Sequence, residues 1–133
     1  MDKPVEVLII DDEVIVCDRL KEFLTGKGLG VEAFTESEKA VARMRERTFD
    51  VVVTDLKMTG PTGMDVLRLI RETQPSTVGI LITAYGQFEK VREAEALGAF
   101  DVIHKPFQLS EIHKLVLKAA KRAKKAPKHT KEP

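Results

Sequence analysis

Val51-Val52-Val53-Thr54-Asp55 is the segment that decides the fold class of this chain, because four β-branched residues run together and lead into an acid. A run of this kind favours a strand that is covered on both faces, as strands are in a parallel sheet. Four other runs are equally short and largely apolar: Val5–Ile10, Val31–Phe34, Val78–Ile82 and Phe100–Ile103. The sequence therefore predicts five strands for one parallel sheet.

Helical periodicity separates these runs, because each one is followed by apolar residues that recur on one face of a helix. The five stripes pass through Leu20 and Leu24, through Ala40, Val41 and Met44, through Met64, Leu67 and Ile70, through Phe88, Val91 and Leu97, and through Ile112, Leu115, Val116, Ala119 and Ala123. Strict alternation of strands and helices implies right-handed crossovers and a doubly wound sheet. We expect an α/β protein, a (βα)5 fold with five parallel strands in the flavodoxin-like order 2-1-3-4-5.

Two of the predicted helices carry signals at their ends. Thr35 and Glu38 have the spacing of a capping box immediately before the second stripe. Gly98 follows the fourth stripe and suits a left-handed cap at the carboxyl end of a helix. We expect Thr35 to cap the second helix and Gly98 to end the fourth.

Length and composition indicate one soluble globular domain. The chain has 133 residues, of which 43% are hydrophobic and 32% are charged. It contains no apolar run near the roughly 20 residues that a membrane span needs, and its amino terminus lacks the apolar core of a signal peptide. The single cysteine, Cys17, excludes an intramolecular disulfide and fits a reducing compartment. We expect a cytoplasmic protein without membrane association.

Charge divides the chain into an acidic body and a basic tail. The net charge is +1, but residues 114–133 hold 8 of the 22 lysines and arginines and a single acid, so residues 1–113 carry 14 basic and 20 acidic side chains. An acidic body argues against direct binding of nucleic acid. Because the apolar stripes end at Ala123, we expect a domain over residues 1–123 and a flexible basic tail or linker over residues 124–133.

Polar residues follow four of the predicted strands at their carboxyl ends. These residues are Asp11 and Asp12 after the first run, Asp55 at the end of the third, Thr83 after the fourth and Lys105 after the fifth. Ligands of doubly wound sheets bind at this edge, next to the point where the strand order reverses, so we expect the groups to converge. Taken singly, the adjacent acids could cap a helix, the threonine could be an ordinary strand residue, and the lysine could lie exposed at a turn.

The predicted cluster suits a divalent cation. Three carboxylates at one edge resist joint ionisation unless positive charge is present, and carboxylate oxygens are ligands for Mg²⁺, which also takes up phosphate oxygens. Lys105 precedes Pro106, a setting in which a cis peptide bond is affordable, and a turn held there would aim its ammonium group at the same edge. The sequence therefore predicts a magnesium site at which a carboxylate could accept a phosphoryl group.

Four motifs in this order resemble the receiver domain of two-component response regulators. They are Leu8-Ile9-Ile10-Asp11-Asp12-Glu13, Thr54-Asp55-Leu56-Lys57-Met58, Thr83-Ala84-Tyr85-Gly86, and Gly98-Ala99 through Lys105-Pro106-Phe107. The resemblance extends over about residues 5–122. Within the family, the segments Leu56-Lys57-Met58 and Ala84-Tyr85-Gly86 are most similar to the NtrC-type group.

The resemblance implies a phosphoryl acceptor and a set of metal ligands. Asp55 would accept a phosphoryl group from a sensor histidine kinase or a phosphotransfer protein. Asp12 would bind Mg²⁺ directly and Asp11 through water, joined by Asp55 and the backbone carbonyl of Lys57. Such a domain is not an enzyme toward external substrates, because it catalyses only its own phosphorylation and dephosphorylation.

The resemblance also implies a switch. Lys105 would neutralise charge on the phosphoryl group, and Thr83 would turn its hydroxyl toward a phosphoryl oxygen. This movement would change a protein-interaction surface made of the fourth helix, the fifth strand and the fifth helix. The surface would control an output domain, attached beyond the carboxyl end of this chain, or a partner, and it could also form a homodimer.

Two positions depart from the family pattern. The family usually has proline where this chain has Thr59, and often has an aromatic residue three positions before the lysine, where this chain has Val102. Val102 cannot perform the inward ring rotation that accompanies the threonine movement in many members. Either the switch runs without that ring, or Tyr85 or another group contributes to it.

Three other functions fit parts of the pattern. A receiver-like docking module that no longer uses phosphate would have no need of all the strand-end residues. A phosphoryl hydrolase with Asp55 as its nucleophile would carry a second acid two residues later, where this chain has Lys57. A flavin-binding relative would carry a hydroxyl- or glycine-rich loop after the first strand, where three acids stand instead. The phosphorylated receiver accounts for the whole set.

Overall fold

Five parallel strands form one sheet in a computed structural model, which describes residues 3–84 and 86–125. The strands are β1 (Glu6–Ile10), β2 (Gly30–Phe34), β3 (Val51–Asp55), β4 (Val78–Ala84) and β5 (Asp101–Lys105). Their order is β2-β1-β3-β4-β5. Ile10 pairs with Thr54, and Asp55 with Ile82, so the central strands end nearly level. The predicted fold class and strand order are confirmed.

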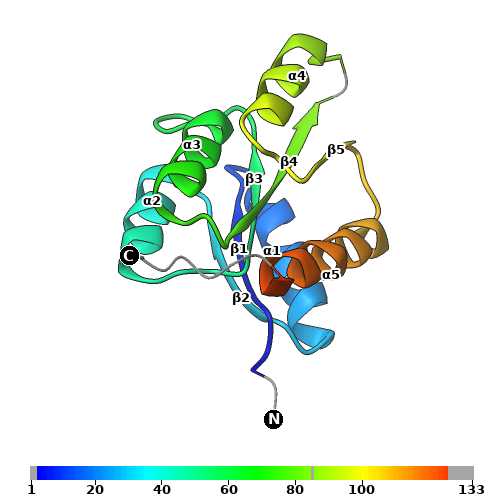
Figure 1. Ribbon diagram of the computed structural model, residues 1–133. Coiled ribbons are helices and arrows are strands. Elements are labelled where there is room, and N and C mark those ends of the chain that lie inside the picture. Colours follow the sequence, from blue (N-terminus) through cyan, green and yellow to red (C-terminus); the bar gives the residue numbers. More distant parts are fainter. Residues whose placement is uncertain (1–2, 85, 126–133) are drawn as a thin grey trace, which may run out of the picture.

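A helix follows every strand. The helices are α1 (Val14–Gly26), α2 (Ser37–Glu46), α3 (Gly63–Thr73), α4 (Phe88–Ala96) and α5 (Leu109–Lys125). As Figure 1 shows, α1 and α5 cover one face of the sheet, and α2, α3 and α4 cover the other. Gly98, with a φ of 97°, follows α4 as predicted. Within the described residues, no helix is both long enough and apolar enough to cross a membrane.

The last helix extends past the end of its predicted stripe. The stripe ends at Ala123, whereas α5 continues to Lys125. Residues 126–133, which make up most of the predicted tail, lie outside the described residues. The boundary between domain and tail therefore stays a prediction.

Alternate residues of the central strands supply two layers of core. In β1, Val7 and Ile9 pack against α1 and α5, whereas Leu8 and Ile10 pack against α2 and α3. β3 divides in the same way, and all five of its residues are buried. Cys17 is buried on the α1 side, as a small core residue. The strand that ends in Asp55 is thus fixed by packing on both faces.

Side-chain capping differs from the prediction at α2. The helix begins after Glu36, whose side chain makes no cap hydrogen bond, so the capping box expected from Thr35 is wrong. The hydroxyl of the first helical residue, Ser37, is bonded to a neighbouring loop instead. A complete capping box is present at α3, where Thr62 and Asp65 exchange hydrogen bonds with each other's backbone. This box fixes the start of the helix that follows β3.

Gly63 brings the start of α3 against the end of β3. Its N–H donates to the Leu56 carbonyl at 2.9 Å, and an added Cβ would collide with the Asp55 carbonyl oxygen and lie 2.9 Å from Leu56 Cα. Because backbone atoms cannot easily move aside, we predict that Gly63→Ala lowers the free energy of unfolding by about 2 kcal/mol, although alanine favours helix by about 1 kcal/mol.

Urea unfolding measures this loss, and Gly26→Ala in α1 is its matched control. Nothing lies within 4 Å of a Cβ added at Gly26, so that variant should be neutral or slightly more stable than the wild type. Equal urea midpoints for Gly63→Ala and the wild type would contradict the close approach described for α3.

Candidate functional site

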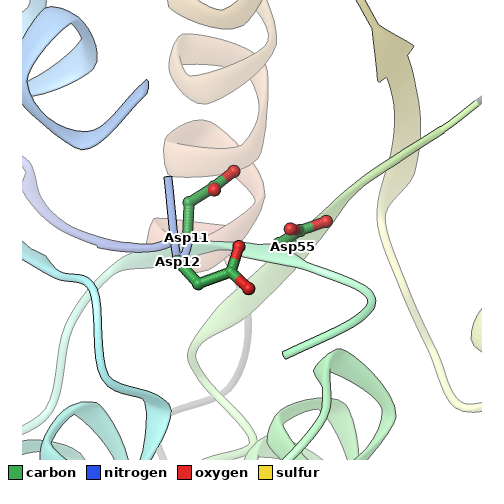
Figure 2. A group of neighbouring side chains, drawn as sticks. All are labelled: Asp11, Asp12 and Asp55. Atoms are coloured by element: carbon green, nitrogen blue, oxygen red, sulfur yellow. The ribbon is translucent and has the colours of Figure 1, made fainter. Parts of the chain in front are cut away.

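Three carboxylates meet at the carboxyl edge of the sheet. Asp11 and Asp12 follow β1, Asp55 ends β3, and one oxygen of each lies within 4.8 Å of the others (Figure 2). Asp11 is fully buried and Asp55 nearly so, whereas Asp12 is exposed. The structure thus brings the predicted acids together, with one of them open to solvent.

Hydrogen bonds orient the two buried carboxylates. Asp11 Oδ1 accepts from the Glu13 N–H and Asp55 Oδ1 accepts from the Leu56 N–H, both at 2.8 Å. The Cys17 thiol donates to the backbone carbonyl of Asp11 at 3.1 Å. Each buried carboxylate therefore has Oδ1 tied to the backbone, while its Oδ2 faces a lysine.

That lysine is Lys105, the last residue of β5. Its Nζ lies 2.7 Å from Glu13 Oε1, 3.0 Å from Asp11 Oδ2 and 3.4 Å from Asp55 Oδ2. The peptide bond that follows it, to Pro106, is cis, as the sequence allows. One ammonium group therefore serves three carboxylates at once.

Burial and like charge raise the pKa of both buried acids. For Asp11 the main cause is desolvation, which outweighs the Glu13 N–H and Lys105. The pKa of Asp55 is raised first by desolvation and second by the charge of Asp11, against the opposing effect of Lys105. Burial lowers the pKa of Lys105, but its hydrogen bond to Glu13, its close contact with Asp11 and its attraction to the acids prevail, so that this pKa is raised. The single positive charge of Lys105 therefore does not balance the negative charges of the carboxylates around it.

An open cleft of about 330 Å³ leads to Asp55. It is lined by Asp12, Glu13, Asp55, Lys57, Thr83, Ala84, Gln87 and Lys105. Thr83 is only 2% exposed, and it stands in β4 opposite His104 of β5. Each predicted site residue therefore lines this cleft, except Asp11, which contacts it through Lys105.

The atoms gathered here suit a hard divalent cation. All three acids offer carboxylate oxygens, the ligands that Mg²⁺ prefers. Asp11 Oδ2 is buried, yet it accepts no hydrogen bond from any residue that the structure describes. It faces Lys105 only as an ion pair, and so keeps lone pairs free to accept from a metal-bound water. The residues present fit a magnesium ion.

Glu13 is a site residue that the motifs did not single out. Its exposed carboxylate follows two acids at the start of a helix, which is the ordinary place for a solvated acid. Lys105 is 92 residues away in sequence and forms its closest contact with this carboxylate. No local signal announces such a pairing, because it depends on the strand order.

Val102 and Thr59, the two departures from the family pattern, lie on different sides of the site. Val102 packs beside Leu56, Leu81 and Ala94 in an apolar cluster formed with α3 and α4. The Thr59 carbonyl accepts the hydrogen bond from Ser37. Tyr85, the third residue of the predicted threonine motif, lies outside the described residues.

Comparison with known sequences identifies relatives of this chain. The profile of the family described as "Response regulator receiver domain" matches residues 7–117. Transcriptional regulatory protein ZraR of Escherichia coli O157:H7 is 30% identical over 115 residues, which cover 86% of this chain and 26% of ZraR. The chain thus spans about a quarter of the length of this curated relative.

Solved structures agree with this result. The crystal structure of a response regulator receiver domain protein from Clostridium thermocellum superposes with a TM-score of 0.84 at 30% identity, covering 90% of this chain and 97% of that one. The solution structure of the beryllofluoride-activated NtrC4 receiver domain dimer has a TM-score of 0.82 at 26% identity, with coverages of 89% and 98%. The chain therefore belongs to the family of response regulator receiver domains of two-component systems, and within it is similar to receivers of the NtrC-type group.

Proposed function

We propose that this receiver domain accepts a phosphoryl group on Asp55 from the phosphohistidine of a sensor histidine kinase or a phosphotransfer protein. The observation that carries the proposal is the position of Asp55. Its carboxylate opens on a cleft of about 330 Å³, with Lys105 Nζ 3.4 Å from Oδ2 and two further acids within 4.8 Å. Positive charge and oxygen ligands thus stand where a transferred phosphoryl group would lie.

The proposed transfer uses the oxygen of Asp55 that the backbone leaves open. Oδ1 is held by the Leu56 N–H, so Oδ2 attacks phosphorus. The new P–O bond forms as the P–N bond to the imidazole breaks, and the leaving nitrogen keeps the electron pair and takes a proton from solvent. Lys105 then stands beside the phosphoryl oxygens, where its charge stabilises the transition state.

Asp11, Asp12, Asp55 and the backbone carbonyl of Lys57 are the proposed holders of Mg²⁺. Asp12 would bind directly, since it is exposed at the cleft, and Asp11 would bind through water. When bound, the ion supplies positive charge that neutralises the phosphoryl oxygens and the repulsion among the acids. The buried Asp11 Oδ2 supports this assignment, because it forms an ion pair with Lys105 and keeps lone pairs for a metal-bound water.

Thr83 is the proposed link to the output surface. It is buried at the wall of the same cleft, and turning its hydroxyl toward a phosphoryl oxygen would draw the β4–α4 connection inward. The surface made of α4, β5 and α5 would respond. Because Val102 is aliphatic and packs against the apolar cluster that includes Ala94 of α4, this response would run through displacement of the helix and loop, without rotation of an aromatic ring.

Two relatives suggest what the surface made of α4, β5 and α5 would contact. ZraR is named a transcriptional regulatory protein and is about four times as long as the matched part, so an attached output domain is one candidate. The activated NtrC4 receiver is described as a dimer. We therefore include a homodimer through α4, β5 and α5 in the proposed function.

Incubation with Mg²⁺ and acetyl phosphate tests the proposed function. We expect one phosphoryl group per chain, stable in acid and labile in base, and located on Asp55 by peptide mapping. Chelation of the metal with EDTA should prevent its formation. Absence of the adduct, or its formation at another residue, would contradict the proposal and favour a receiver fold that works by docking alone.

A further inference from the structure

Ser37 connects the start of α2 to the loop that follows the acceptor strand. Its side chain is 1% exposed, and its Oγ donates a hydrogen bond of 3.0 Å to the backbone carbonyl of Thr59. The two residues are 22 positions apart in sequence. A buried hydroxyl that joins two separate segments restricts how they move relative to each other.

This hydroxyl is not used by its own helix. Serine at a helix start ordinarily caps the first turn, but the cap residue of α2 is Glu36, and no side-chain cap hydrogen bond is formed there. The bond from Ser37 is directed away from α2 to the β3–α3 loop, residues 56–62. The loop, rather than the helix, is the segment that this bond restrains.

Two other residues of the same loop, Met58 and Gly60, also lie against α2. A Cβ added at Gly60 would lie 3.3 Å from Glu38 Cγ and 3.5 Å from Ser37 Oγ, so the loop backbone closely approaches the first turn. Met58 packs against the apolar cluster that contains Val41 and Met44 of α2. This part of the loop therefore packs directly against α2.

The ends of the loop are held independently of Ser37. The Leu56 N–H donates to the Ile82 carbonyl, and the Leu56 carbonyl accepts from the Gly63 N–H, both at 2.9 Å. Thr59 lies between these anchors and two residues beyond Lys57. Threonine does not fix its own backbone as a proline ring would, so restraint at this position has to come from a contact.

We infer that Ser37 is a positioning residue for the metal site, which acts by holding the loop that presents the Lys57 carbonyl. This inference rests on the proposed function, in which that carbonyl is a ligand of Mg²⁺. Ser37 touches neither the metal nor the phosphoryl group. It keeps the backbone at Lys57 in place, so that less ordering is required when the ion binds.

The test compares Ser37→Ala with the wild type by isothermal titration with Mg²⁺. Loss of one supporting hydrogen bond should weaken Mg²⁺ binding by about tenfold. Trypsin cleavage after the exposed Lys57 in the metal-free protein provides a second readout, because a loop released from α2 should be cut about tenfold faster than in the wild type.

Thr77→Val is the matched control. The Thr77 hydroxyl is also buried and also donates to a backbone carbonyl, that of Phe49, at 2.6 Å. Thr77 precedes β4 and so lies at the amino-terminal edge of the sheet, opposite the acids. Thr77→Val should therefore lower the melting temperature about as much as Ser37→Ala does, and leave Mg²⁺ affinity unchanged.

The outcomes separate the inference from the function on which it rests. Weaker Mg²⁺ binding and faster cleavage after Lys57 in Ser37→Ala alone support a positioning role. Mg²⁺ affinity of Ser37→Ala within about twofold of the wild type, or equal weakening in Thr77→Val, overturns that role and leaves the proposed function intact. A wild type that binds no Mg²⁺ overturns both.

Discussion

Replacing Asp55 with asparagine is expected to abolish phosphorylation by acetyl phosphate and, at neutral pH, to make the folded protein more stable. The first effect follows because an amide oxygen cannot form the acyl phosphate. The second follows because Asp55 is nearly buried and its pKa is raised by desolvation and by Asp11. Removing a charge that the fold disfavours should increase the free energy of unfolding by about 0.5–2 kcal/mol.

The pH dependence of this gain identifies its cause. The pKa of Asp55 in the folded protein lies above its ordinary value of 3.8, so the folded state binds more protons than the unfolded state over the interval between the two. Stability of the wild type therefore falls as pH rises through that interval. The advantage of Asp55→Asn should be absent below about pH 3.8 and grow above it.

Thermal unfolding between pH 3 and pH 8 measures this curve, with Asp18→Asn on the exposed side of α1 as the control. The control should keep its phosphoryl adduct and stay within about 0.5 kcal/mol of the wild type. An Asp55→Asn variant that is less stable than the wild type at pH 7 would show that attraction to Lys105 outweighs desolvation.

Replacing Lys105 with methionine should have the opposite effect on stability. Lys105 Nζ is within 3.4 Å of three carboxylates, one of which, Asp11, is fully buried. Removing one partner of a buried ion pair leaves an uncompensated charge, and we expect a loss of about 2–4 kcal/mol at pH 7. The side chain of Lys105 is 23% exposed, which keeps this loss below that of a fully enclosed pair.

The loss should depend on pH and on metal. The destabilisation by Lys105→Met should be smaller in acid, where Asp11 and Asp55 take up protons. It should also decrease in alkali, because the stabilisation by Lys105 is complete below its ordinary pKa of 10.5 and is lost above its raised pKa in the folded state. Saturating Mg²⁺ should restore part of the stability, because the ion replaces the missing charge.

Lys39→Met provides the control for this substitution. The Lys39 side chain is 69% exposed, and its ion pair with Glu36 is 3.4 Å long, so the expected change is at most about 0.5 kcal/mol. Equal destabilisation of Lys105→Met at pH 4 and pH 7 would indicate that the lysine stem, and not its charge, is what stabilises the fold.

The central strands and the acids were predictable because their signals are local. A run such as Val51–Val53 can only be buried on both faces, and strict alternation with helices leaves few strand orders open. The same topology places Asp11, Asp12 and Asp55 at one edge before any coordinate is known. Patterns that repeat along the chain therefore specify the frame of the site.

The pairings that complete the site were not predictable in the same way. Glu13 meets Lys105 across 92 positions, and Ser37 meets Thr59 across 22. Each of these contacts depends on how neighbouring segments pack after the sheet has formed, and an exposed acid or a serine near a helix start has a simpler local use. The capping box expected from Thr35 failed for this reason.

The complete burial of β3 divides the site into two parts with different freedom to change. Asp55 ends a strand in which every residue is enclosed, whereas Asp12, Glu13 and Lys57 stand on exposed connections. Substitution in the strand would disrupt two core layers, while substitution on the connections would leave them intact. Duplicated copies of such a domain could diverge in reaction speed and in choice of partner while retaining one architecture.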